Sequence, residues 1–175
     1  MRYIALLRGI NLGGKTMVKM EELRTIFEAL GLKGVKTYIN SGNAAFDTRT
    51  VDEGKLTAML EGAMEKTLGK AIPVMVRNQP HINEILDKNP FEGQYESHKE
   101  MQVLFLKEVM PTDDANRLAE AALPGERYAV RGREIYAHLP VGVAGSLLTK
   151  MFIEKKLKTV YTGRNWRTVQ KLAEL

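Results

Sequence analysis

The chain has 175 residues, no cysteine and a net charge of +5, from 26 basic and 21 acidic side chains. This length fits one domain or two small ones packed together, and 44% apolar with 27% charged residues is an ordinary globular composition. The lack of cysteine excludes a disulfide scaffold, an iron–sulfur cluster and a thiol nucleophile. The small positive charge permits anionic partners without requiring them.

The first apolar run, residues 3–7, is short. A signal peptide needs an apolar stretch of about 7–15 residues and a membrane span about 20. We therefore expect a cytoplasmic protein that does not insert into a membrane.

The net charge is unevenly distributed along the chain. Residues 1–50 carry +4, residues 51–145 carry −4 and residues 146–175 carry +5. If the two ends meet in space, the molecule has a basic face; the alternative is an ordinary solvated surface.

The first half predicts six elements in the order β-α-β-β-α-β, from short β-rich runs and from apolar residues at helical spacing. One helix follows a capping box at Thr50 and Glu53, and Pro73 indicates that the last strand is an edge strand. The expected strands are 3–8, 35–39, 44–46 and 72–76, and the expected helices are 19–30 and 53–68.

The polar, turn-rich segment 89–100 follows, and we place the two halves at residues 1–88 and 100–175. The elements expected after the first half are helices at 78–88, 112–123, 146–157 and 164–175, and strands at 101–106, 128–130 and 134–139. The fold class predicted is α+β, with two ferredoxin-like (split βαβ) halves, mainly antiparallel sheets and a C-terminal helix.

In a split βαβ unit the first two strands are parallel, so their carboxyl ends lie on one edge of the sheet. Polar residues and glycines follow both strands, and with a helix start nearby they could hold a phosphate or carboxylate. The candidate ligand-binding residues here are Arg8, Asn11, Gly13, Gly14, Lys15, Asn40, Ser41 and Asn43. The alternative is that the glycines make a tight connection and that Ser-Gly-Asn is a plain hairpin turn.

Residues 9–16 (GINLGGKT) also match the P-loop pattern, with Lys15 for phosphates and Thr16 for Mg²⁺. Two features oppose a P-loop phosphotransferase. The apolar period of the next helix starts only at Met20, and the strands after it form a tight hairpin, whereas a P-loop domain has a mostly parallel sheet. Phosphate binding without hydrolysis fits better.

The last segment is dense in polar and aromatic residues. On a helix, Arg164, Arg167 and Lys171 line one stripe at spacings i, i+3 and i+7, while Trp166 faces the core. The stripe could add Arg164 and Arg167 to the anion site, could track the phosphates of a nucleic acid, or could stay solvated. A nucleic-acid-binding module is therefore the alternative function.

No other chemistry stands out. His81, His98 and His138 match no metal-ligand spacing, and we find neither a nucleophile–base pair nor a dinucleotide fingerprint. The expectation is no cofactor and no metal, with enzymatic activity left open.

Three separated motifs resemble the bacterial domain-of-unknown-function family 1697. They are the run at residues 3–14 (YIALLRGINLGG) with Val18-Lys19-Met20, the run at 37–43 (TYINSGN), and the run at 162–169 (TGRNWRTV). The resemblance implies an α+β protein with ferredoxin-like halves and supplies no reaction. It also weakens the P-loop match, because the Gly-Gly pair is usual in the family pattern and the following Lys-Thr is not.

Overall fold

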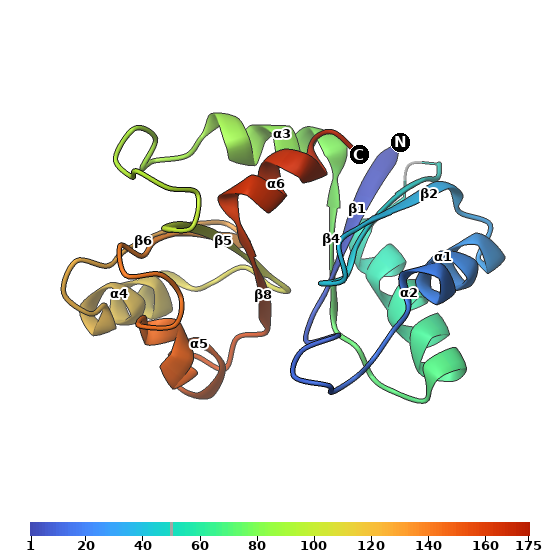
Figure 1. The fold of residues 1–175 in the computed structure, drawn as a ribbon, viewed down its shortest axis with the longest axis horizontal. Coiled ribbons are helices and arrows are strands. Elements are labelled where there is room, and N and C mark those ends of the chain that lie inside the picture. The colour runs from blue at the N-terminus through green and yellow to red at the C-terminus, as the bar shows by residue number, and fades with distance from the viewer. Residues whose placement is uncertain (50) are drawn as a thin grey trace. The chain divides into compact units, whose positions relative to one another are not determined.

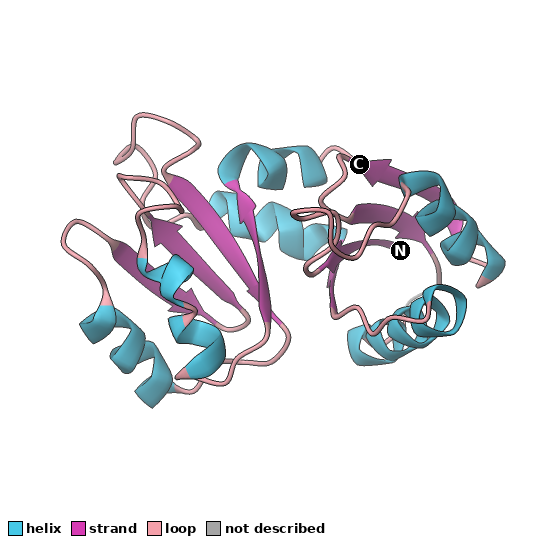
Figure 2. Cartoon of the chain, turned by 60° about the horizontal axis from the view of Figure 1, so that its bottom comes forward, coloured by secondary structure: helices cyan, strands magenta, loops and turns pink. Residues whose placement is uncertain are grey.

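A computed structural model describes residues 1–49 and 51–175 and divides the chain into two compact units. The first unit comprises Met1–Ile85 with Lys171–Leu175, and the second comprises Leu86–Gln170. Each unit is built on a four-stranded antiparallel sheet, drawn as magenta arrows in Figure 2. The predicted fold class, α+β with two ferredoxin-like halves, is confirmed.

The first sheet has the order β2-β3-β1-β4. Its strands are β1 (Arg2–Leu7), β2 (Lys33–Tyr38), β3 (Asn43–Asp47) and β4 (Val74–Asn78). Both β2 and β1 pair antiparallel with β3, so β1 and β2 run in the same direction and end at the same edge. Strand β4 is an edge strand, as Pro73 predicted.

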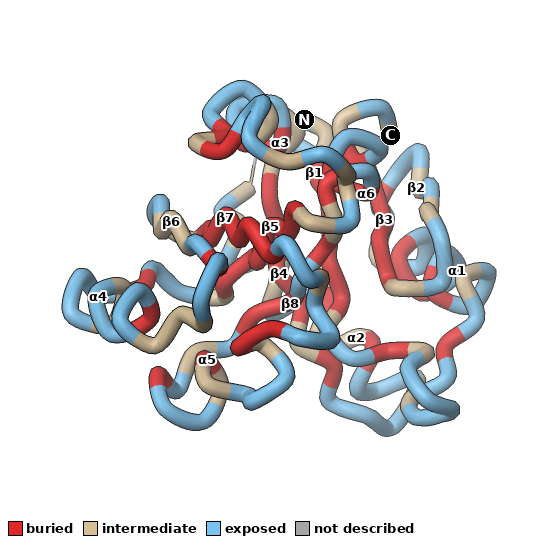
Figure 3. The backbone as a smooth tube through the Cα atoms, turned by 60° about the vertical axis from the view of Figure 1, so that its left-hand side comes forward, coloured by how far each residue is buried: buried red, intermediate tan, exposed pale blue. Residues whose placement is uncertain are grey.

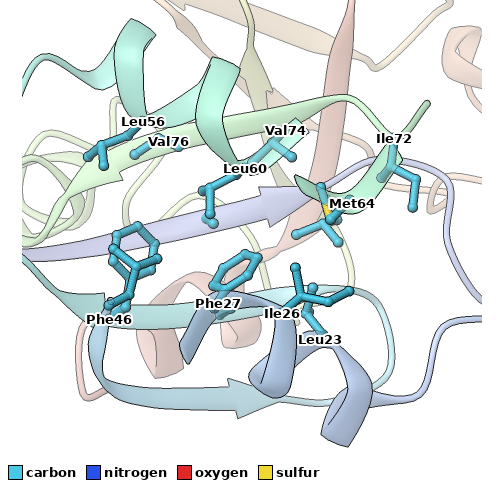
Figure 4. Packing of buried hydrophobic residues seen from close by; sticks show 14 of the residues in the cluster. Leu23, Ile26, Phe27, Phe46, Leu56, Leu60, Met64, Ile72, Val74 and Val76 are labelled. Atoms are coloured by element: carbon cyan, nitrogen blue, oxygen red, sulfur yellow. The ribbon is translucent and has the colours of Figure 1, made fainter. Parts of the chain in front are cut away.

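Two helices, α1 (Met20–Ala29) and α2 (Glu53–Leu68), cover one face of this sheet (Figure 1). Their apolar residues recur at helical spacing and converge with the strands on one core (Figure 4). Within it, Phe27 meets Phe46 edge to face, with ring centroids 5.7 Å apart. Each large side chain buried in this way contributes about 1.5–3 kcal/mol to folding.

The start of α2 differs from the predicted capping box. Thr50 lies outside the described residues, and Glu53 is the first helical residue. The N-cap is Asp52, whose carboxylate accepts the backbone N–H of Lys55 at 3.1 Å. Glu53 instead accepts the backbone N–H of Asn78 at 2.9 Å, which joins α2 to β4.

The second sheet has the order β6-β7-β5-β8. Its strands are β5 (Met101–Leu106), β6 (Arg127–Arg131), β7 (Glu134–His138) and β8 (Tyr161–Asn165). The other elements are α3 (Gln79–Asp87), α4 (Thr112–Ala121), the 3-10 helix η1 (Leu147–Lys150), α5 (Phe152–Lys155) and α6 (Trp166–Leu172). Among the described residues, no helix combines the length and the apolar character that crossing a bilayer requires.

Two predictions for the second half are wrong. The helix expected from Arg164 is strand β8 followed by α6, which begins only at Trp166. The helix expected at 146–157 is two short helices, because Met151 adopts a left-handed backbone conformation (φ 53°) between them. Ser146 does cap the first of these, accepting the backbone N–H of Leu148.

The last strands of the two halves share a local structure that the sequence alone did not reveal. Arg77 and Arg164 each donate to the carbonyl of the preceding residue at 2.8 Å. Asn78 and Asn165 each accept, at 2.9 Å, the backbone N–H three residues later and so cap the following helix. The Arg-Asn pair is therefore an internal repeat at the end of β4 and of β8.

Burial differs sharply among the strands. Figure 3 shows β1 and β3 almost entirely buried, whereas β2 is exposed or half-buried.

In the second unit, the buried carboxylate of Glu126 holds neighbouring segments together by hydrogen bonds. It accepts the backbone N–H of Leu147 at 3.0 Å, that of Leu123 at 3.2 Å and the hydroxyl of Tyr128 at 2.8 Å.

Two glycines allow a matched test of backbone strain. Gly42 has a φ of +84°, and a Cβ there would lie 2.8 Å from side-chain atoms of Leu7 and Ile10. We expect Gly42→Ala to lower the free energy of unfolding by about 2 kcal/mol. Gly62, in the exposed middle of α2, has open space around it. Gly62→Ala should raise the free energy of unfolding by about 0.5–1 kcal/mol. Urea titrations of both variants check this pair, and equal effects would contradict the turn geometry.

The Tyr128 hydroxyl predicts a pH dependence. Burial, and then its hydrogen bond to Glu126, raise the pKa of Tyr128 above the ordinary value of 10.0. The folded state therefore keeps the proton of the Tyr128 hydroxyl at pH values above about 10, where the unfolded state loses it. The contribution of this hydroxyl to stability is complete below that pH and falls above it. Tyr128→Phe should be less stable than the wild type by about 1 kcal/mol at neutral pH. The difference should shrink as the pH rises above about 10. Urea titrations across this range measure it; a constant difference would show that the hydroxyl titrates normally.

Candidate functional site

The loop between β1 and α1 contains a narrow turn. Gly13 and Gly14 are its central residues, with φ of +56° and +74°, and the backbone N–H of Lys15 donates to the carbonyl of Leu12 at 3.0 Å. Two successive positive φ values characterise a type I′ turn, which glycine adopts most readily. The turn itself therefore accounts for the glycine pair.

This turn is incompatible with a P-loop. The backbone N–H of Asn11 donates to the carbonyl of Thr16 at 3.1 Å, so the segment is a small hairpin closed on itself. Helix α1 begins at Met20, well after Lys15, and both sheets pair antiparallel. The P-loop alternative is therefore wrong, as the late helix start and the hairpin strands indicated.

The side chain of Asn11 fixes the loop in place. Its amide nitrogen donates to the carbonyls of Val18 at 2.9 Å and of Asn40 at 2.7 Å, and its oxygen accepts the N–H of Val18 at 2.8 Å. Asn11 also has a positive φ of 54°, which Asn tolerates better than most residues. The bond to Asn40 joins the β1–α1 loop to the β2–β3 turn, so the juxtaposition that the topology predicted is present.

The β2–β3 turn is held by Asn43, which is fully buried. Its amide donates to the carbonyl of Tyr38 at 2.9 Å and to the hydroxyl of Ser41 at 3.0 Å. Gly42 then lets the turn approach β1, where its carbonyl accepts the N–H of Leu7 at 2.8 Å. The buried side chain of Asn43 therefore stabilises the conformation of the turn through its hydrogen bonds.

A surface hollow of about 520 Å³ lies where these segments meet. Its lining includes Asn11, Met17, Lys19, Met20, Glu22 and Asn40. Lys19 is the N-cap residue of α1, and its side chain makes no capping hydrogen bond. The positive end of the helix dipole therefore adds to the ammonium group of Lys19, while the carboxylate of Glu22 opposes both.

Five of the lining residues were not predicted: Met17, Val18, Lys19, Met20 and Glu22. The polar character of the loop predicted Lys15 instead. Lys15 is exposed at the turn and does not line the hollow. No local signal in the sequence identifies them: Met17 is 63% exposed, but Leu12 of the same loop is 64% exposed and does not line the hollow.

The remaining candidates are placed as follows. Gly13 and Gly14 are exposed at the tip of the turn, Arg8 is half-buried, and Ser41 accepts the amide of Asn43. None of these residues, including Asn43, lines the hollow. Their contact with a ligand stays a prediction.

Arg164 and Arg167 belong to the second unit. Arg164 is only 6% exposed and donates to the hydroxyl of Thr162 at 2.7 Å, and burial lowers its pKa to about 10. Arg167 is exposed on α6. The helical stripe predicted for them does not exist, because Arg164 lies on β8; their binding of an anion stays a prediction.

Metal chemistry finds no support in the described part of the chain. Residues 1–49 and 51–175 contain no group of three or more His, Asp or Glu side chains placed to hold a metal ion. His138, the most buried histidine, contacts Glu100 at 3.3 Å and Arg127 at 3.0 Å.

The Asn11 hydrogen bonds can be tested with a matched pair. Asn11→Asp keeps the shape but replaces both donors with a carboxylate facing two carbonyls, so we expect the free energy of unfolding to fall by about 2 kcal/mol. Asn40→Asp makes the same chemical change at an exposed side chain that makes no hydrogen bond within the described residues. It should change stability by less than about 0.5 kcal/mol. Urea titration measures both; similar losses would mean that the Asn11 side chain does not hold the loop.

The comparisons with known proteins agree with this architecture. A solved structure, that of the conserved bacterial protein SP0830 from Streptococcus pneumoniae, is similar to this chain, with 26% sequence identity and a TM-score of 0.73 over 99% of this chain and 97% of that chain. No curated protein matches significantly. The family described as "Protein of unknown function (DUF1697)" matches residues 1–136, more than half of the sequence. This range contains the motifs at 3–20 and 37–43 and ends before the one at 162–169. The resemblance to the family is thereby confirmed: the chain belongs to the DUF1697 family.

Proposed function

We propose that the protein binds a small organic anion in the hollow between the β1–α1 loop and the β2–β3 turn. The observation that carries this proposal is the bond between Asn11 and Asn40. It joins two segments 29 residues apart in sequence, and both residues line one hollow at the uncapped start of α1. Backbone N–H groups at a helix start favour an anionic group there.

The length of the β1–α1 loop supports a role beyond connection. The second half makes the equivalent link, from Leu106 to Thr112, with the five residues 107–111. The first half uses the twelve residues 8–19 and folds part of them into a hairpin. Because the shorter link suffices for the same topology, the added residues are not needed to build the fold.

The lining also limits the kind of anion. Lys19 supplies a cation, whereas Glu22 disfavours a ligand with several negative charges. Met17, Val18 and Met20 add an apolar surface, and methionine adapts readily to different shapes. A singly charged ligand with an apolar body, such as a carboxylic acid or a phosphate diester, fits this lining best.

The nucleic-acid alternative has no comparable support. It depended on a helical stripe of Arg164, Arg167 and Lys171. Strand β8 removes Arg164 from that stripe, and the ammonium group of Lys171 lies 2.7 Å from the carboxylate of Glu174.

Calorimetric titration with hexanoate, and with hexylamine as the charge-reversed probe, tests the proposal. We expect hexanoate to bind and hexylamine not to. Lys19→Gln should weaken hexanoate binding about fivefold, equivalent to about 1 kcal/mol. Lys36→Gln removes an exposed charge on β2, outside the lining, and is the matched control; it should leave the Kd unchanged. Equal binding of the two probes, or equal effects of the two substitutions, would contradict an anion site at Lys19.

A further inference from the structure

The two sheets have the same strand order but are not covered equally. In the first unit the 16-residue helix α2 spans one face of the sheet. At the corresponding place in the chain, the second unit has η1 and α5, of four residues each (Figure 1). Part of the second sheet is therefore left open on the face that carries its helices.

Strand register identifies the residues at this opening. Tyr3 pairs with Asn78 in the first sheet as Gln102 pairs with Asn165 in the second. Tyr3 fills its position: its ring stacks on Phe46 at 6.0 Å. In the second sheet the position is taken by a glutamine.

One step further along, the first sheet pairs Ala5 with Val76, and the second pairs Leu104 with Gly163. Val76 is buried in the core, whereas Gly163 has no side chain to contribute. A Cβ at Gly163 would lie 3.3 Å from Cδ2 of Leu104, closer than an ordinary van der Waals contact, so glycine lets the side chain of Leu104 pack against the backbone here.

The result is a hollow of about 310 Å³, entirely within the second unit. Its lining includes Gln102, Leu104, Val143, Leu148, Tyr161 and Gly163. This volume lies at the lower end of the range of about 300–1,000 Å³ for ligand pockets, which suits a single-ring molecule. The walls are apolar or aromatic, so a charged ligand would lose hydration without compensation.

Gln102 gives the hollow its chemical character. It is only 9% exposed, and its side-chain amide makes no hydrogen bond within the described residues. The amide is not one of the fully enclosed groups that lack a partner, so its polar atoms open into the hollow that it lines. A ligand there can replace the water that an accessible amide binds. The other polar side chain of the lining, Thr149, already donates to the carbonyl of Ser146 at 2.8 Å.

We propose that this hollow binds a neutral, flat, single-ring heteroaromatic molecule with an amide-type edge, which pairs with the side chain of Gln102. A carboxamide offers one donor next to one acceptor, and an amide or lactam edge presents the complementary pair. The apolar side chains and Tyr161 enclose the ring. This site is independent of the anion hollow, since it shares no residue with it and lies in the other unit.

The test is an NMR titration of the full chain with nicotinamide and with uracil, using toluene as the apolar control and nicotinate as the charged one. We expect both amide-bearing rings to shift the resonances of Leu104 and Leu148. Toluene and nicotinate should bind at least about tenfold more weakly. Toluene forms no hydrogen bond with the side chain of Gln102. Nicotinate carries a charge, which would lose its hydration in the apolar hollow. If toluene binds as tightly as nicotinamide, the amide is not recognised and the proposal is wrong.

Three variants locate the site. Gln102→Leu should weaken nicotinamide binding at least about tenfold and leave the Tm unchanged or raised, since it removes a buried polar group. Gly163→Ala should weaken the binding of nicotinamide and toluene alike, because its Cβ would displace the side chain of Leu104, which lines the hollow. Gln170→Leu, an exposed position on α6, is the matched control and should change neither. A large fall in Tm for Gln102→Leu, with no effect of any ligand on the wild type, would show that the amide serves the fold through bound water.

Discussion

The central position of β1 determines where the polar groups of the first unit can lie. It is hydrogen-bonded to β3 on one side and to β4 on the other, and it is buried along almost its whole length. Because β2 must then run parallel to β1, the segments that follow both strands meet at one edge of the sheet. Asn11 completes the arrangement, since it bonds its own loop and the carbonyl of Asn40 with one amide group.

The success of the sequence-based predictions follows how far each segment determines its own structure. Strand β5 is a run of buried residues (MQVLFL) and was predicted with its observed bounds. Strand β8 (YTGRN) has a glycine and three polar residues, so no local pattern identifies it. It is a strand because its backbone pairs with β5, and Arg164 can be buried there because its guanidinium donates to Thr162 and Gly163.

The same reasoning explains what could be predicted of the candidate site. Strand direction alone brought the segment of Asn11 next to that of Asn40. The contributions of Lys19 and Glu22 depend on where α1 begins and which way its first turn faces, and neither follows from residue type. The place of Gln102 in a hollow could not be predicted either. Strand β5 reads as an apolar strand with one polar interruption, and the hollow depends on the shortness of η1 and α5.

The two halves together separate what the fold requires from what it merely permits. The Arg-Asn pair at the end of β4 recurs at the end of β8 with the same hydrogen bonds, so the fold itself accounts for Arg164 through its counterpart Arg77. The twelve-residue loop before α1, and the hollow that Gln102 and Gly163 line together with residues of η1, have no such counterpart in the other half. A ferredoxin-like half forms without each of them. The search for the activity of this family therefore belongs at these two unrepeated features, rather than at the arginines whose positions the topology already explains.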